Sequence, residues 1–119
     1  MQIQILKSKL HKARVTDASV DYEGSMTIDV DLMKKVGLNA YEKILVGNMG
    51  NGARFETYVI PGAAGSRAIE LNGATAYLGK KGDSLTIMSF ALIDHSSAPE
   101  WKPKVVVLDE HNAIKFDRT

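Results

Sequence analysis

"YEKILVGNMGNGARFETYVIPG", residues 41–62, places two apolar runs on either side of the dipeptide Asn51-Gly52. Asn-Gly between such runs is a strong hairpin signal, because both residues tolerate the positive φ angles that tight hairpin turns require. Pro61-Gly62 closes the second run. This stretch therefore predicts a β-hairpin and a mainly β fold.

The segments before the hairpin predict two further strands and one short helix. Residues 2–15 alternate with a period near two, and one face of this strand changes from apolar to cationic along its length. We expect the strand to begin in a core and to end beside a cavity. Residues 26–38 predict a short strand, then a helix that is capped by Asp29 or Asp31 and ends at Gly37.

The segments after the hairpin are short strands separated by turns. Residues 67–93 predict a strand, a corner at Asn72-Gly73, a short helix through Tyr77, a turn at residues 80–83 and an apolar strand. Residues 102–116 predict a strand, a polar turn and a last strand. Short strands with only one or two brief helices indicate a small closed β-barrel.

The composition is that of one soluble domain spanning residues 1–119. Apolar residues make up 45% of the chain and charged residues 24%, and the formal net charge is +1. No run of basic residues indicates binding to nucleic acid or to a membrane. Cysteine is absent, which excludes disulfides and thiolate catalysis. The N-terminal residues lack the continuous apolar stretch of a signal peptide, and we expect a cytoplasmic protein.

Neither a metal site nor a phosphate site is predicted. The histidines, His11, His95 and His111, are far apart in the sequence, and none has a second histidine two to four residues away. The glycine-rich segments 47–52 and 61–66 lack the lysine spacing and the strand-to-helix context of phosphate-binding loops. Both segments are interpreted as turns.

The dipeptide Gly24-Ser25, within "YEGSMTID" at residues 22–29, is a candidate site of self-cleavage. A serine hydroxyl can attack the preceding carbonyl only if the backbone bends sharply, and a preceding glycine permits conformations closed to other residues. The attack would convert the amide into an ester, which can break by β-elimination and leave a ketone at the new N-terminus. By itself the dipeptide is also compatible with an ordinary turn.

Six blocks extend this observation along nearly the whole chain. They are KSKLHKARVTDA (7–18), YEGSMTID (22–29), NGARFETY (51–58), LNGATA (71–76), Gly82-Asp83 and PKVVVLDEHN (103–112). In this order they resemble the pyruvoyl-dependent aspartate 1-decarboxylase family, also called aspartate alpha-decarboxylases. The resemblance implies a six-stranded double-psi β-barrel with short helices, assembled as a homotetramer.

The resemblance also implies the activity and the cofactor. The chain would cleave itself between Gly24 and Ser25 into a short chain, residues 1–24, and a longer chain, residues 25–119. Ser25 would become a covalent pyruvoyl group that forms a Schiff base with the substrate amine, in place of pyridoxal phosphate and without a metal. The reaction would convert L-aspartate to β-alanine and CO2 and supply pantothenate and coenzyme A synthesis. A maturation factor is a further candidate partner.

Within this family pattern, Lys9 and Arg54 are the cations expected to bind the substrate carboxylates. Arg54 suits a two-pronged contact and Lys9 a point-charge contact. Tyr58 shares the strand parity of Arg54, so both can face one cavity, and its phenol is the expected proton donor. The resemblance gives Thr57 a part in maturation and in substrate binding, although alternation points it away from Arg54 and Tyr58.

The other expected site residues form a wall and a supporting shell. Asn72, with the backbone of Gly73 and Ala74, is expected to hold the pyruvoyl group or a substrate oxygen. His11 and Tyr22 are expected to support the site rather than to react.

Two residues depart from the family pattern. Met26 follows the serine, and Thr75 interrupts the usual alanines after Asn72-Gly73. The first bears on the rate of maturation and the second on the pocket wall. Two alternative functions also fit the residues: a self-processing hydrolase with an N-terminal serine nucleophile, and a non-catalytic barrel that serves as a binding or assembly module.

Overall fold

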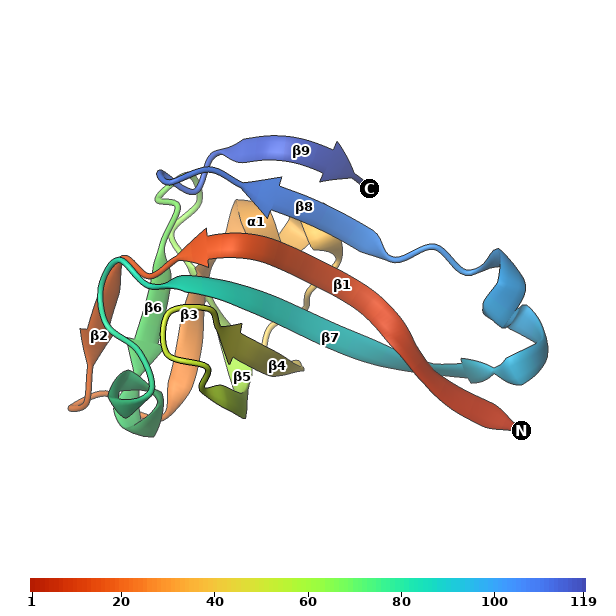
Figure 1. Ribbon diagram of the computed structural model, residues 1–119, viewed down its shortest axis with the longest axis horizontal. Helices are drawn as coiled ribbons and strands as arrows, with labels where there is room; N and C mark the ends of the chain where they lie inside the picture. The colour runs from red at the N-terminus through yellow and green to blue at the C-terminus, as the bar shows by residue number, and fades with distance from the viewer.

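Strands dominate the fold of this chain (Figure 1). The computed structural model describes every residue from Met1 to Thr119. The strands are β1 (Gln2–Arg14), β2 (Asp17–Ser19), β3 (Ser25–Asp29), β4 (Lys43–Asn48), β5 (Arg54–Gly62), β6 (Ile69–Asn72), β7 (Ser84–Asp94), β8 (Lys104–Leu108) and β9 (Ile114–Arg118). The helices are α1 (Val30–Val36) and the 3₁₀ helices η1 (Gly73–Tyr77) and η2 (His95–Glu100). The predicted mainly β fold with short helices is confirmed. None of the helices is long and apolar enough to cross a membrane.

The structure has nine strands where the family resemblance implies six, and the sheet topology explains the difference. The strands pair in the order β2-β6-β3-β5-β4-β7-β1-β8-β9. Only Val15 and Thr16 separate β1 from β2, so the two strands form one bent segment of chain. Within this segment β1 pairs with β7 and β2 pairs with β6. The sheet thereby closes into a ring of six strands if β1 and β2 are counted together. The hairpin of β8 and β9 lies outside this ring, on the edge of β1.

The core lies inside this ring and consists of side chains from alternate strand positions. Eighteen buried apolar residues form one cluster. Alternation in β4 and in the first half of β7 buries every second residue, which is the pattern expected of strands with one buried face. The apolar ones among them, Ile44, Val46, Leu85 and Ile87, belong to this cluster. Helix α1 packs against this core with Leu32, Met33 and Val36.

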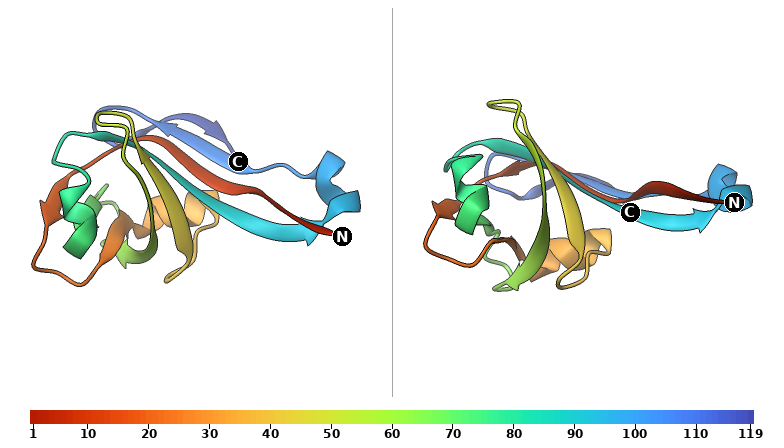
Figure 2. Two further views of the ribbon diagram at one scale, coloured as in Figure 1. Left: turned by 60° about the horizontal axis from the view of Figure 1, so that its bottom comes forward. Right: turned by 90° about the horizontal axis from the view of Figure 1, so that it is seen from below.

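The expectation that the first strand begins in the core is wrong. The start of β1 pairs with the end of β7 and projects away from the barrel as an arm, which gives the molecule a long axis of 44 Å (Figures 1 and 2). Irregularities between Leu6 and Ser8 and between His11 and Ala13 shift the register of β1. As a result the core contains Leu10 as well as Ala13 and Val15, although simple alternation would place Leu10 on the opposite face from the other two.

The local turn signals are borne out. The hairpin of β4 and β5 turns within the loop of residues 49–53, where Gly52 has a φ of 76° but Asn51 does not have a positive φ. Of the two candidate helix caps, Asp29 is the one used: its side chain accepts a hydrogen bond from the amide of Asp31. Helix α1 ends at Gly37, which has a left-handed conformation. Helix η2, at the tip of the arm, was not predicted.

Candidate active site

Ser25 begins strand β3 and is only 2% exposed, although the segment before it is a surface loop. Its hydroxyl donates a weak hydrogen bond to the carbonyl of Glu23, at 3.3 Å, and accepts one from the side-chain amide of Asn72, at 3.2 Å. The same amide donates to the hydroxyl of Thr27 at 2.9 Å. The hydroxyl of Ser25 is therefore held in a fixed place beside the Gly24-Ser25 bond.

The environment of this dipeptide is specific to it. The chain has a second Gly-Ser pair, Gly65-Ser66, which lies on an exposed loop. There the serine hydroxyl contacts only the amide of Ala68, at 3.3 Å. Burial and a polar side-chain partner thus distinguish Ser25 from Ser66.

Gly73 packs directly against Gly24. A Cβ at position 73 would lie 2.7 Å from both the Cα and the N of Gly24 and 2.8 Å from the carbonyl oxygen of Tyr22. Gly73 also has a φ of 63°, which favours glycine. The missing side chain lets the corner at Asn72-Gly73 approach the candidate scissile bond.

We predict that Gly73→Ala displaces this bond and slows its cleavage by at least tenfold, since the added methyl group meets backbone atoms that cannot rotate away. The strained backbone should also cost about 1–3 kcal/mol of stability. A gel time course of cleavage and a thermal melt measure the two effects. Gly65→Ala is the matched control, because Gly65 has a φ of 78° but open space around its Cα. Equal cleavage rates in the two variants would contradict this account.

A small pocket of about 280 Å³ adjoins Ser25. The pocket is lined by Asn72, whose side-chain amide donates to Ser25, and by Thr27, which accepts a hydrogen bond from the same amide. Tyr22 also lines it and is 70% exposed. Ala74, on the adjoining turn, is exposed as well. The pocket thus has a polar wall next to the candidate cleavage site.

The two predicted cations meet in a different pocket. Lys9 and Arg54 line a cavity of about 400 Å³, together with Thr86 and other residues, none of which is acidic. Neither cation takes part in the ion pairs of the chain. Gly47 pairs with Arg54 across the hairpin, and a Cβ at this position would lie 3.7 Å from the guanidinium. Two unpaired cations without an acidic neighbour suit a ligand with two carboxylates.

His11 reaches this cationic pocket through Thr86. The Nδ1 atom of His11 lies 3.3 Å from the hydroxyl of Thr86. Burial, with the nearby charges of Lys9 and Lys12, lowers the pKa of His11. The lowered pKa favours the neutral imidazole, which can share a hydrogen bond with the hydroxyl of Thr86.

Strand β5 carries Arg54, Thr57 and Tyr58 on the faces that alternation predicts. Arg54 and Tyr58 are both exposed and share a face, whereas Thr57 points to the opposite side. Four residues of strand separate Arg54 from Tyr58 by about 13 Å, and Tyr58 does not line the cationic pocket. Tyr58 instead packs beside Tyr41, with 6.5 Å between ring centroids. Within one chain the two residues share a face but not a cavity.

The register of the sheet relates β5 to the candidate cleavage site. Strands β3 and β5 are parallel, with Met26 opposite Val59. The start of β3 at Ser25 therefore lies alongside Thr57 and Tyr58, which precede Val59. On its other side, Ser25 pairs with Asn72 of β6. The fold thus brings residues from three distant segments to one place.

Sequence comparisons identify the group to which this arrangement belongs. The family model described as aspartate decarboxylase matches residues 1–115. The chain belongs to the aspartate decarboxylase family. Aspartate 1-decarboxylase from Desulfotalea psychrophila is 51% identical over 112 residues, which cover 94% of each chain. The enzymes of the same name from Chlorobium phaeovibrioides and Leptospira biflexa are each 48% identical, over 97% of this chain and over 90% and 98% of their own length.

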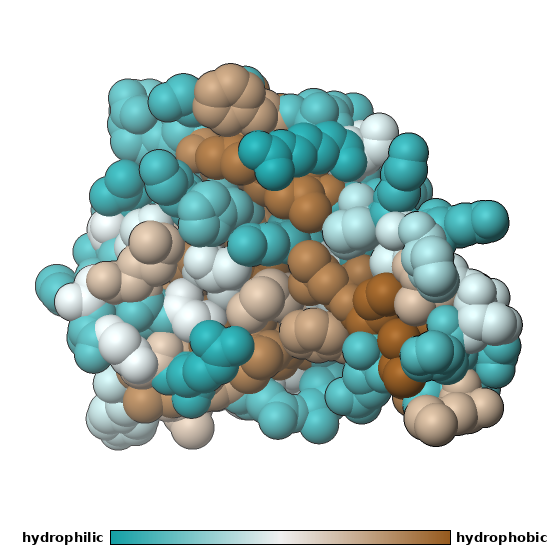
Figure 3. Space-filling view, turned by 45° about the vertical axis from the view of Figure 1, so that its right-hand side comes forward, coloured by the Kyte–Doolittle hydropathy of each residue, from teal (hydrophilic) through white to brown (hydrophobic).

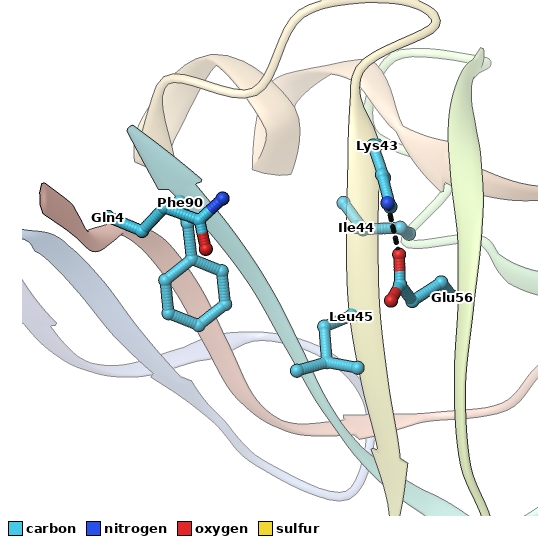
Figure 4. Close-up of a pocket in the computed structure, with 6 residues that line it drawn as sticks. All are labelled: Gln4, Lys43, Ile44, Leu45, Glu56 and Phe90. Carbon is cyan, nitrogen blue, oxygen red and sulfur yellow. Dashed lines mark ion pairs between the residues drawn. The ribbon is translucent and has the colours of Figure 1, made fainter. Parts of the chain in front are cut away.

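The largest pocket of this aspartate decarboxylase family member holds none of the predicted site residues. It measures about 510 Å³ and lies between the arm and the β4–β5 hairpin (Figure 4). Phe90 and Gln4 enter from the arm, and the ion pair of Lys43 and Glu56 lies opposite. Its charged groups are already paired, so it offers no free cation to an acidic substrate.

Three polar residues near the site were not predicted as site residues from the sequence. Thr27 shares the strand parity of Ser25, so period-two alternation could have indicated it. Thr86 contacts His11 across the β1–β7 pairing, which no local pattern reveals. Thr75 was noted only as a departure from the family pattern, yet its hydroxyl lies 3.3 Å from the carbonyl oxygen of Ser25. No group of three or more potential metal ligands gathers anywhere in the chain.

Proposed function

We propose that this chain is a self-processing aspartate 1-decarboxylase that converts L-aspartate to β-alanine and CO2. The observation that carries the proposal is the buried Ser25 behind Gly24, with its hydroxyl held by Asn72, in a member of the aspartate decarboxylase family. The product would supply pantothenate and coenzyme A synthesis in the cytoplasm. Family membership favours this function over an N-terminal-serine hydrolase and over a non-catalytic module.

The surroundings of Ser25 fit a pyruvoyl group derived from it. The three-carbon group would occupy the volume of Ser25. It would retain the main-chain carbonyl oxygen of Ser25, which lies 3.3 Å from the hydroxyl of Thr75, whereas Oγ, to which the amide of Asn72 donates, would leave with the carboxylate of Gly24. A pyruvoyl group supplies an electrophilic carbonyl that takes up the electrons released when CO2 leaves. We assign Thr57 a supporting part in the cleavage, because β5 runs beside the start of β3.

Lys9 and Arg54 are proposed to bind and orient the substrate carboxylates. Arg54 presents a planar fork that matches a carboxylate, and Lys9 adds a second charge from the same pocket. Tyr58 is proposed to donate a proton to the carbon that loses CO2, since its phenol is partly exposed and not hydrogen-bonded within the chain. The backbone of Gly73 and Ala74 forms the remaining wall.

A homotetramer would bring these groups together. Ser25 and the cationic pocket lie apart within one chain, so a second copy is proposed to place its cations opposite Ser25 of the first. Apolar side chains on the exposed arm, such as Phe90 and Leu92, support contact between copies. Figure 3 shows apolar surface interspersed with polar groups on the side of the molecule toward the arm.

The direct test is turnover of L-aspartate by the purified protein, with β-alanine and CO2 as the measured products. Omission of added pyridoxal phosphate should not lower the rate. Treatment with a carbonyl reagent such as phenylhydrazine should abolish activity. A cleaved protein that forms no β-alanine would contradict the proposed substrate.

We predict that Arg54→Ala lowers kcat/KM for aspartate by about 10- to 150-fold, which corresponds to about 1.5–3 kcal/mol for a charged hydrogen bond. Cleavage at Gly24 should be nearly unchanged, because Arg54 is placed against substrate and not against the scissile bond. Arg118→Ala, which removes a charge from the outer strand β9, is the control and should retain activity.

Co-expression tests whether two copies share one site. Arg54→Ala should be impaired as predicted above and a cleavage-deficient Ser25 variant should be inactive. Mixed tetramers should exceed the activity of either variant alone if Arg54 and Ser25 come from different chains. No recovery in verified mixed tetramers would contradict the shared site.

In the single variant, unchanged kcat/KM of Arg54→Ala would mean that Arg54 does not bind the substrate.

A further inference from the structure

Thr75 provides a hydroxyl that reaches the main-chain carbonyl of Ser25. It lies in η1, is 7% exposed, and follows the corner that Gly73 brings against Gly24. Its Oγ1 atom lies 2.8 Å from the carbonyl oxygen of Asn72 and 3.3 Å from the carbonyl oxygen of Ser25. A threonine hydroxyl carries one proton and donates to one of these oxygens at a time. Ser25 is thus contacted at both ends, by Asn72 at its hydroxyl and by Thr75 at its carbonyl.

The proposed cleavage has a step in which this carbonyl changes charge. First, Oγ of Ser25 attacks the carbonyl carbon of Gly24 and the C–N bond breaks, which leaves an ester and a free amine on Ser25. A solvent base then removes the α proton of Ser25. The electron pair forms a Cα=Cβ bond while the Cβ–Oγ bond breaks and releases the carboxylate of Gly24. Water finally hydrolyses the imine tautomer of the new N-terminus and releases ammonia, which leaves the ketone.

As the α proton leaves, negative charge spreads from Cα onto the carbonyl oxygen of Ser25. We propose that the hydroxyl of Thr75 donates a hydrogen bond to this oxygen and thereby accelerates the elimination step. An oxygen that gains negative charge is a stronger acceptor than the neutral carbonyl of Asn72. The hydrogen bond of the Thr75 hydroxyl therefore shifts from Asn72 to Ser25 as the step proceeds. Fixed donors aimed at developing charge stabilise a transition state without reorganisation. This inference rests on the proposed function.

The position makes the assignment specific to this chain. The family resemblance expects alanine where Thr75 stands, and alanine has no hydroxyl to donate. Because alanine is usual at this position, removal of the Thr75 hydroxyl should slow the elimination step rather than abolish it. The contact is also long and shared with Asn72, so the effect should fall below that of a dedicated oxyanion donor.

The test follows maturation after a short pulse of cell-free synthesis of the full chain. Thr75→Val keeps the shape of the side chain without the hydroxyl, Thr75→Ala gives the residue usual in the family, and Thr75→Ser keeps the hydroxyl. We expect Val and Ala to slow formation of the 25–119 chain by about ten- to a hundredfold. Thr75→Ser should mature within about threefold of the native chain.

Hydroxylamine identifies the slowed step, because it cleaves esters at neutral pH and leaves amides intact. In Thr75→Val and Thr75→Ala, ester should accumulate and give a 25–119 chain that begins with serine, heavier by one ammonia than the pyruvoyl chain. Native maturation rates in both variants, or slow maturation without accumulated ester, would overturn the role of Thr75. A native chain that never cleaves would instead refute the proposed function itself.

Discussion

Replacing Ser25 with alanine should leave the chain uncleaved and reduce β-alanine formation to background. The attacking oxygen is lost, so neither the ester nor the pyruvoyl group can form. The fold should survive, because the amide of Asn72 keeps its hydrogen bond to Thr27 when the hydroxyl of Ser25 is absent. Intact mass, circular dichroism and an aspartate turnover assay measure the three outcomes.

Ser66→Ala is the matched control for this variant. It removes the hydroxyl from the second Gly-Ser pair of the chain, which is exposed and lacks a side-chain partner. It should cleave after Gly24 and turn over aspartate as the native chain does. Appearance of two fragments in Ser25→Ala would refute the attack by Ser25. Loss of cleavage in Ser66→Ala would show that the reaction does not belong to Gly24-Ser25 alone.

Replacing Tyr58 with phenylalanine should separate maturation from turnover. The ring still packs beside Tyr41, and no step of the cleavage calls for the phenol. Protonation of the carbon that loses CO2 does need a donor, and such acid catalysis contributes about a hundred- to ten-thousandfold. We therefore expect a matured protein whose kcat is lower by about this factor.

Tyr41→Phe controls for the loss of a phenol at the same surface. Tyr41 lies next to Tyr58 on the neighbouring loop and is mostly exposed. Its replacement should leave kcat within about twofold of the native value. Native turnover in matured Tyr58→Phe would mean that another group or a water molecule supplies the proton. Failure of this variant to mature would assign Tyr58 to the cleavage instead.

Local sequence signals predicted the turns and the helix ends well. The conformations of Gly52, Asp29 and Gly37 have local chemical reasons that do not depend on the rest of the fold. The strand β1 shows the limit of such signals. Its two register shifts depend on pairing with β7, so simple alternation assigned its faces incorrectly and placed its start in the core.

The candidate site was less accessible to pattern analysis, because its contacts join distant segments. Ser25 and Asn72 are 47 residues apart, and only the pairing of β3 with β6 brings them together. The family resemblance supplied these residues where periodicity could not. The close approach of Gly73 to Gly24 and the contact of Thr75 with Ser25 depend on the three-dimensional fold and became apparent only in the structure.

The most direct measurement is the intact mass of the purified native protein under denaturing conditions. The account predicts two chains, residues 1–24 and residues 25–119, with the longer chain lighter by one ammonia than a chain that begins with serine. Gly65-Ser66 should remain unbroken. A single chain of 119 residues that stays intact on prolonged incubation and does not react with carbonyl reagents would contradict the account, as would a longer chain that retains an N-terminal serine.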